Sequence, residues 1–337
     1  MNIIGKRPDG YHELESVMQA VSLCDDVTVR MRYGAGGADA ATVSMDTGDA
    51  YIAAQAIPAD GRNTVLRAAE AYFVRGGPRG GRRADIHIRK RIPAAAGLAG
   101  GSADAAAVLC ALNDIAAQAH GVDGVRPLTE AELLEAAFCV GADVPFCLLY
   151  GTEGVEGGSA PHTAYAWGTP HTEYAGGAPH TAYAWGTPHT ECAGGAPHTA
   201  FATGVGEKLR RVPRPPPRYA VALANPRMEV STARVFAAYS PPPDYEIEKI
   251  SKLTRAMIES HIEDWTRCYN ALERSVTELH PEIGRLKTAL LGAGALCAVM
   301  SGSGPTVFGL FDGADNAARA AEAIRGGGAW TAVCEFL

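Results

Sequence analysis

The stretch PAAAGLAGGSADAAA, residues 93–107, decides the fold of this 337-residue chain. Glycine or alanine fills every position from 94 to 101 except Leu98, so a bulky anion could approach the backbone closely. The first N–H groups of a helix lack internal partners and carry the positive end of its dipole. The sequence therefore predicts a phosphate-binding loop that opens onto a helix, and a tight packing turn between strand and helix is the alternative.

The residues on either side of this stretch support that interpretation. Residues 84–92 alternate apolar and polar side chains, which predicts a half-buried strand. Residues 102–116 contain only four polar side chains, which predicts a buried helix. Ser102 would stand at the helix start, where its hydroxyl could cap the helix or contact a phosphate or its Mg²⁺. The residue directly before Ser102 is glycine and not lysine, so the pattern differs from the Gly-Lys-Ser/Thr P-loop.

Composition limits the classes of function. The chain is 47% hydrophobic and 20% charged, as is usual for a globular protein. A net charge of −7 without a dense basic run gives no reason to expect nucleic acid as a partner. The longest uncharged apolar runs are too short to span a bilayer, and eight scattered cysteines without a C-x-x-C pair favour reduced thiols. We expect a cytoplasmic protein without a membrane partner.

Several shorter patterns carry a specific local expectation. Asn63 can cap a helix over residues 64–74, and Thr129 with Glu132 forms a capping box for a helix over 129–140. Asp143 follows that helix and precedes an apolar run, residues 144–150, for which we predict a strand. On the sequence alone, Asp143 reads as a turn residue. We also predict a helix over residues 261–279 that serves mainly for packing.

The phosphate-loop stretch closely resembles the corresponding motif of the GHMP kinases, Pro-x-x-x-Gly-Leu-x-[Gly/Ala/Ser]-Gly-Ser. GKRPDGYHEL at 5–14, GADVPF at 141–146 and ALCAVMSGSGPTVFGLF at 295–311 also resemble family segments, in family order, and the last is expected to pack beside the phosphate loop. The resemblance implies an α+β fold with a mixed, ribosomal-protein-like N-terminal domain, residues 1–213, and a ferredoxin-like C-terminal domain, residues 214–337. The proline-rich run at 212–217 suits the boundary, and the active site is expected between the domains.

The same resemblance implies roles for individual residues. Asp143 would be the catalytic residue, and Tyr11, His12, Thr232 and Phe236 would contact the acceptor substrate. Contacts with ATP would come from Pro93, Ala94, Ala95, Ala96, Gly97, Leu98, Ala99, Gly100, Gly101, Ser102 and Ala103, with Lys90 and Asn63. Capping alone would explain Asn63, and core packing would equally explain Phe236. ATP and Mg²⁺ are the expected cofactors, with no metal site built by the protein alone.

The resemblance is most specific at Tyr11 and His12. In one branch of the family, the corresponding Tyr-His pair frames a cytosine ring. It implies ATP-dependent phosphorylation of the 2-hydroxyl of 4-diphosphocytidyl-2-C-methyl-D-erythritol, in the non-mevalonate route to isoprenoid precursors. Two alternatives stay open: another small-molecule GHMP kinase, and an inactive truncated scaffold that displays a His-rich repeat to a metal or protein partner. The oligomeric state is not predicted.

Two features depart from the family pattern. Residues 160–201 repeat an 18-residue unit rich in Ala, Gly, Thr, Pro and His, and an insertion at about 154–199 contains most of this repeat. We interpret it as an expanded surface loop, with metal binding or a short β-repeat as alternatives. The family's Ala-Lys-[Ile/Leu]-Asn-Leu strand, about a dozen residues before the GKRPDGYH segment, has no counterpart. We expect a start placed too far downstream and weak activity of the chain as given.

Overall fold

The computed structural model describes residues 1–34, 37–77, 80–119, 126–151, 171–173, 180–185, 198–212, 218–241 and 262–337. The chain forms two compact units. The first unit consists of Met1–Leu23, Pro93–Leu98 and Gly195–Leu337, and the second of Cys24–Ile92 and Ala99–Gly194. The boundary expected between residues 213 and 214 lies outside the described residues and stays a prediction.

A mixed sheet forms one layer of the second unit, with strand order β4-β5-β3-β7-β6. The strands are β3 (Asp26–Tyr33), β4 (Ala40–Asp46), β5 (Arg82–Arg89), β6 (His171–Glu173) and β7 (His180–Trp185). Strand β5 pairs antiparallel with β3 and parallel with β4. Its residues alternate strictly between buried and more exposed positions, as the period-2 pattern predicted.

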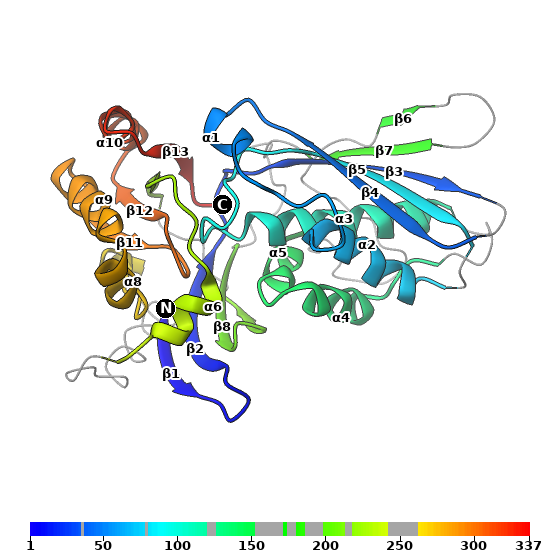
Figure 1. Cartoon of the computed structure of the whole chain (residues 1–337), viewed down its shortest axis with the longest axis horizontal. Helices are drawn as coiled ribbons and strands as arrows, with labels where there is room; N and C mark the ends of the chain where they lie inside the picture. The colour runs from blue at the N-terminus through cyan, green and yellow to red at the C-terminus, as the bar shows by residue number, and fades with distance from the viewer. Residues whose placement is uncertain are drawn as a thin grey trace. The chain divides into compact units, whose positions relative to one another are not determined.

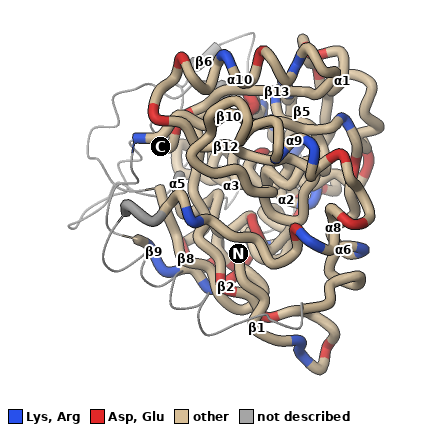
Figure 2. The backbone as a smooth tube through the Cα atoms, turned by 90° about the vertical axis from the view of Figure 1, so that its left-hand side faces the viewer, with Lys and Arg blue, Asp and Glu red and all other residues tan. Residues whose placement is uncertain are grey.

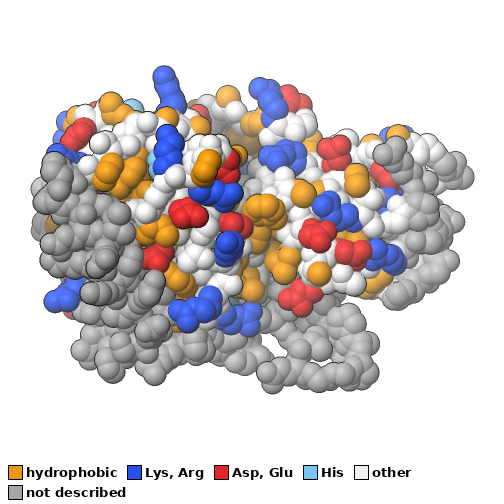
Figure 3. Space-filling model, turned by 90° about the horizontal axis from the view of Figure 1, so that it is seen from below, with side chains coloured by type: hydrophobic (Ala, Val, Ile, Leu, Met, Phe, Trp, Pro, Cys, Tyr) orange, Lys and Arg blue, Asp and Glu red, His pale blue; other side chains and the backbone are white. Residues whose placement is uncertain are grey.

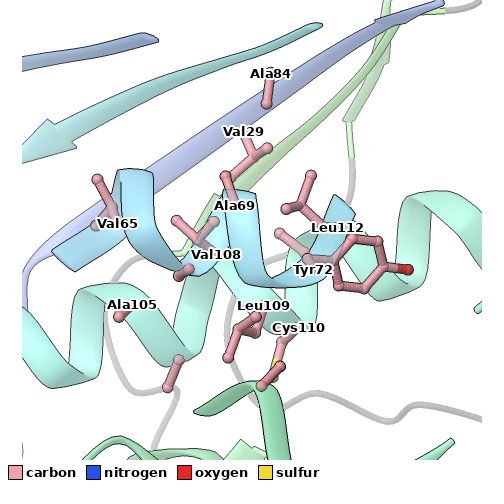
Figure 4. Close-up of a cluster of buried hydrophobic side chains, with 14 of the residues drawn as sticks. Val29, Val65, Ala69, Tyr72, Ala84, Ala105, Val108, Leu109, Cys110 and Leu112 are labelled. Atoms are coloured by element: carbon pink, nitrogen blue, oxygen red, sulfur yellow. The ribbon is translucent and has the colours of Figure 1, made fainter. Parts of the chain in front are cut away.

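Helices cover one face of this sheet (Figure 1). They are α2 (Thr64–Arg75), α3 (Gly100–Gln118), α4 (Glu130–Val140) and α5 (Val144–Gly151), preceded in the chain by the short α1 (Ala50–Ala53). In Figure 4, Val29 and Ala84 of the sheet lie above Val65 and Ala69 of α2, and Val108 and Leu112 belong to α3. Helix α3 is apolar on nearly every side because the sheet, α2, α4 and α5 all pack against it.

The predicted strand over residues 144–150 is wrong, because these residues form helix α5. A short apolar run without polar residues cannot be assigned to strand or helix by periodicity. Buried strands and buried helices both lack a periodic polar pattern. Val144 and Leu148 are buried, one turn apart, in the core shared with α3 and α4. Asp143 therefore stands at a junction between two helices.

The repeat falls largely outside the described residues. The described parts are β6, β7 and residues 198–201, and β6 and β7 pair antiparallel with each other. Strand β7 also pairs antiparallel with β3, with Val27 opposite Trp185 and Arg30 opposite Ala182. In these residues the repeat contributes strands to the sheet, which favours the β-repeat alternative over a plain surface loop.

The first unit contains two four-stranded sheets. One has the order β1-β2-β8-β9, from β1 (Asn2–Lys6), β2 (His12–Gln19), β8 (Thr199–Gly204) and β9 (Lys208–Arg211). The other has the order β11-β12-β10-β13, from β10 (Ala220–Asn225), β11 (Cys297–Met300), β12 (Val307–Phe311) and β13 (Trp330–Glu335). All neighbours in this second sheet are antiparallel, and helices α9 (Pro281–Gly292) and α10 (Ala314–Gly326) pack on it.

The second sheet has the ferredoxin-like arrangement, because β12 lies between β11 and β10 and each half of the motif is split by a strand of the other. The expected α+β class and ferredoxin-like element are confirmed. The helix predicted over residues 261–279 is wrong in part. The structure has the 3₁₀ helix η1 (Ile262–Arg267), an irregular segment and then α8 (Glu273–Leu279).

The charges and cysteines agree with a globular protein. Basic and acidic residues are interspersed along the described chain and on the face seen in Figure 3 (Figures 2 and 3). The seven cysteines in the described part of the chain are all free thiols. Among the described residues, no helix is long and apolar enough to cross a membrane.

Candidate active site

Helix α3 begins two residues earlier than predicted, and no side chain caps its start. Ala99, the N-cap residue, has a left-handed backbone with φ of 53°, and it makes no side-chain cap. Its carbonyl accepts the N–H of Ser102 at 3.0 Å and of Ala103 at 2.9 Å. The N–H groups of Gly100 and Gly101, the first two residues of the helix, have no acceptor within the helix. Ser102 is the third residue of α3 and not its cap.

Residues 93–98 of the first unit, which together with Ala99 we call the phosphate loop, are held by residues 301–306, which we call the Gly-Ser loop. The Ser301 hydroxyl donates to the Gly97 carbonyl at 2.8 Å, and the Thr306 N–H donates to the Ala96 carbonyl at 3.3 Å. Gly97 has φ of 73°, and a Cβ there would collide with the Ser301 carbonyl and stand 2.7 Å from that of Gly304. Only glycine fits this contact.

A buried ion cluster in the second unit fixes the chain just before the phosphate loop. One carboxylate oxygen of Asp25 accepts the backbone N–H groups of Arg91 at 2.5 Å and Ile92 at 2.9 Å. The other oxygen pairs with the Lys90 amine, which also bonds Asp104 Oδ2 of α3 at 2.8 Å. These three side chains are 7% exposed or less, so the cluster is shielded from water.

The electrostatics of the cluster follow from its two carboxylates and single amine. Burial opposes the charge on Lys90, but the adjacent Asp104 and Asp25 carboxylates raise its pKa overall. Burial raises the pKa of Asp104 to about 7, although Lys90 acts in the opposite direction. The Lys90 amine is thus paired with two buried carboxylates. Its role is to position the chain segment that precedes the phosphate loop. Its contact with ATP stays a prediction.

The start of α2 lies against the start of α3. The Thr64 hydroxyl donates to the Gly101 carbonyl at 2.9 Å, and a Cβ on Gly100 would stand 2.8 Å from Ile92 Cγ2. Asn63 caps α2, since its amide oxygen accepts the Val65 N–H and its nitrogen donates to the Pro58 carbonyl. The capping prediction for Asn63 is confirmed, and its contact with nucleotide stays a prediction.

Asp143 lies at the N-terminus of α5, where its carbonyl accepts the Cys147 N–H at 3.2 Å. The side chain is exposed, yet surrounding protein desolvates the carboxyl enough to raise its pKa. Burial raises the pKa of the Cys147 thiol, and the charges of Asp143 and Asp104 add to that effect. The charges of Asp143 and of Asp104, in the first turns of α3, therefore both act on the Cys147 thiol. An exposed carboxylate with a raised pKa is suited to proton transfer.

In the first unit, two of the four predicted acceptor residues, His12 and Phe236, lie in one aromatic group. The turn after β1 places His12 with its ring centroid 5.5 Å from Phe236 of α6 (Thr232–Ala238) and 5.9 Å from Tyr239. Tyr11 is 64% exposed beside it in the chain. Partial desolvation and nearby Lys6 lower the pKa of His12, so the imidazole is neutral near pH 7.

Sequence reasoning missed Asp25, Asp104, Tyr239 and Ser303. Tyr239 follows Phe236 by three residues, a spacing that could have signalled it. Ser303 lies within the quoted segment at 295–311, and its hydroxyl is 2.7 Å from that of Thr232. Asp25 gave no local signal, because its partners lie 65 to 67 residues away in the sequence.

Comparisons with known proteins show the family to which the chain belongs. Residues 63–151 match the GHMP kinases N terminal domain, and residues 249–329 match the GHMP kinases C terminal domain. The chain belongs to the GHMP kinase family. A homoserine kinase structure from Cytophaga hutchinsonii, 18% identical with a TM-score of 0.58, shares the fold over 95% of this chain and 88% of its own.

The chain is similar over nearly its full length to one named member of that family. It is 35% identical to a 4-diphosphocytidyl-2-C-methyl-D-erythritol kinase of Pelotomaculum thermopropionicum, covering 96% of this chain and 90% of the relative. The Syntrophotalea carbinolica protein of the same name is 34% identical, over 98% and 92%. A crystal structure of 4-(cytidine 5'-diphospho)-2C-methyl-D-erythritol kinase is 29% identical, with a TM-score of 0.61 over 99% and 94%.

Gly97→Ala should weaken nucleotide binding by at least about tenfold, because the added Cβ must push the phosphate loop away from Ser301 and Gly304. Gly294→Ala is the matched control, since Gly294 also has a left-handed backbone, φ of 94°, but open space around it. Both variants should lose about 1 kcal/mol or more of stability. Calorimetric titration with ADP and thermal melts separate the two effects. Equal ADP affinity in the two variants would contradict this account of the loop.

Asp104→Asn should flatten the dependence of stability on pH. A carboxyl whose pKa is raised on folding binds more protons in the native state, so wild-type stability falls as pH rises from about 4 to about 7. The lost slope should approach about 1.4 kcal/mol per pH unit. Urea unfolding at several pH values measures it for both proteins. If the variant kept the wild-type slope, Asp104 would not be the group that titrates.

Proposed function

We propose that this protein is a 4-diphosphocytidyl-2-C-methyl-D-erythritol kinase. It transfers the γ-phosphoryl group of ATP to the 2-hydroxyl of 4-diphosphocytidyl-2-C-methyl-D-erythritol, in the non-mevalonate route to isoprenoid precursors. The observation that carries the proposal is the start of α3, where a left-handed Ala99 presents the N–H groups of Gly100 and Gly101 after a loop of small residues. The full-length similarity to kinases of this name supports the acceptor.

The phosphate groups of ATP are proposed to bind at the N-terminus of α3. Two backbone N–H groups and the helix dipole supply positive potential there without a lysine side chain, since Lys90 is occupied by Asp25 and Asp104. The described residues contain no group of three or more His, Cys, Asp or Glu able to hold a metal ion alone. Mg²⁺ is therefore proposed to enter with ATP, where it would offset phosphate charge, and the Ser102 hydroxyl is the protein group suited to meet it.

Asp143 is proposed to accept or orient the proton of the attacking 2-hydroxyl. Its exposed carboxyl can reach a substrate, and its raised pKa brings its basicity closer to the working pH. Phosphoryl transfer depends mainly on positioning and charge stabilisation, so the fixed helix junction before α5 matters as much as the carboxylate itself.

The cytidyl group is proposed to bind at Tyr11, His12, Thr232 and Phe236. Exposed and half-buried rings offer stacking surfaces for a base, and the neutral His12 imidazole offers one donor and one acceptor. The free thiols in the described chain suit the cytoplasm as the proposed compartment.

Asp143→Asn should lower kcat by about 10²- to 10⁴-fold, because the amide cannot take the proton, while affinity for ADP stays near the wild-type value. A coupled assay that follows ADP release with the cytidyl substrate measures turnover. Homoserine and mevalonate serve as alternative acceptors, and the proposal requires that neither replaces the cytidyl substrate.

Asp49→Asn is the matched control for that experiment. Asp49 also stands at a helix start, where its carboxylate accepts the Tyr51 and Ile52 N–H groups, and asparagine caps helices equally well. The control should therefore keep its turnover. Wild-type turnover in Asp143→Asn would reject Asp143 as the proton acceptor, and wild-type protein inactive on the cytidyl substrate would reject the proposed function.

A further inference from the structure

The Gly-Ser loop joins β11 to β12 and carries two serines with different partners. Its turn is closed by the Ser301 N–H, which donates to the Thr306 carbonyl at 2.8 Å, and by the Gly304 N–H, which donates to the Ser301 carbonyl at 2.8 Å. Gly302 and Gly304 both have a left-handed backbone, with φ of 55° and 84°. The loop therefore has one defined shape, and its two serine side chains have defined places on it.

Buried side chains hold the backbone of this loop from the inside. The Asn270 amide nitrogen donates to the carbonyls of Met300 and Gly302, both at 2.7 Å. One Glu273 carboxylate oxygen accepts the Met300 N–H at 2.8 Å. The Asn225 amide donates to the Thr306 hydroxyl at 2.9 Å. These contacts fix the loop backbone independently of either serine hydroxyl, so a serine-to-alanine change should leave it in place.

The two serine hydroxyls contact different parts of the proposed site. Ser301 donates to the Gly97 carbonyl in the phosphate loop. Ser303 bonds the hydroxyl of Thr232, the first residue of α6, at 2.7 Å. One turn further along α6, Phe236 lies against His12. Ser301 therefore acts on the nucleotide side of the loop, and Ser303 on the acceptor side.

We propose that Ser303 is a positioning residue for the acceptor substrate, acting through the Thr232 hydroxyl, and Ser301, which bonds the Gly97 carbonyl, is its comparison. The inference rests on the proposed function, since it takes Thr232 and Phe236 as acceptor contacts. A threonine hydroxyl bonded to a fixed partner keeps one side-chain rotamer, so Thr232 meets the substrate already oriented. Without Ser303, substrate binding must also pay for ordering that side chain.

The experiment compares Ser303→Ala with Ser301→Ala. Ser303→Ala should raise KM for the cytidyl substrate by about three- to tenfold, the value of one hydrogen bond, and leave KM for ATP within about twofold. Ser301→Ala should raise KM for ATP by about three- to tenfold and leave KM for the cytidyl substrate within about twofold. A general loosening of the loop would raise both constants in both variants, and that result would overturn the proposal.

A double-mutant cycle tests whether Ser303 acts through Thr232. Thr232→Val removes the hydroxyl and keeps the side-chain shape, whereas Thr232→Ser keeps the hydroxyl and should keep the effect of Ser303. Adding Ser303→Ala to Thr232→Val should cause no further loss, because the partner is already absent. Independent, multiplicative losses would overturn the proposed route through Thr232.

Binding measurements separate this inference from the proposed function. Calorimetry without ATP gives the Kd of the cytidyl substrate for wild type and Ser303→Ala, independent of turnover. A three- to tenfold weaker Kd in the variant supports the inference even if wild type fails to phosphorylate the ligand, a failure that would reject only the proposed function. Normal turnover in wild type with an unchanged Kd in the variant overturns the inference and leaves the function standing.

Discussion

The carboxylate of Asp25 is the constraint on which the candidate site depends. It accepts the N–H groups of Arg91 and Ile92 and pairs with Lys90, which in turn reaches Asp104 on α3. The end of β5 and the first turns of α3 are thereby fixed to each other by a buried cluster. Removing Lys90 would leave two buried carboxylates without a cation, at a cost of about 3–5 kcal/mol. The cluster therefore holds the chain segment before the phosphate loop in one conformation.

The phosphate loop has a backbone conformation that costs free energy even for small residues such as alanine. Ala95 and Ala99 have left-handed backbones, with φ of 48° and 53°, each costing roughly 1–3 kcal/mol. Within the first unit, bonds to Ser301 and Thr306 hold Gly97 and Ala96 in place. Ala99 is also the N-cap of α3 and offers no side-chain cap to the first N–H groups of the helix, which are the proposed phosphate donors. Such arrangements are common where binding requires a preformed backbone.

Local signals predicted much of this architecture, and contacts distant in sequence account for the rest. The caps at Asn63 and Thr129 and the small residues before Ser102 act over a few positions, so the sequence reveals them. The apolar run of α5 looks the same as a buried strand, because burial on every side removes the period. Asn270 looked like helix packing, yet it holds carbonyls 30 and 32 residues away. Partners this distant could not be assigned from the sequence.

Backbone amides at the start of α3, without a lysine amine, are proposed to bind the phosphates of ATP. Amide NMR spectra recorded during titration with Mg²⁺ and a non-hydrolysable ATP analogue test it most directly. The account predicts that the resonances of Gly97, Gly100 and Gly101 shift most and saturate together, while Gly294, which lies in open space, does not move. Saturable nucleotide binding that leaves Gly100 and Gly101 unchanged would contradict it.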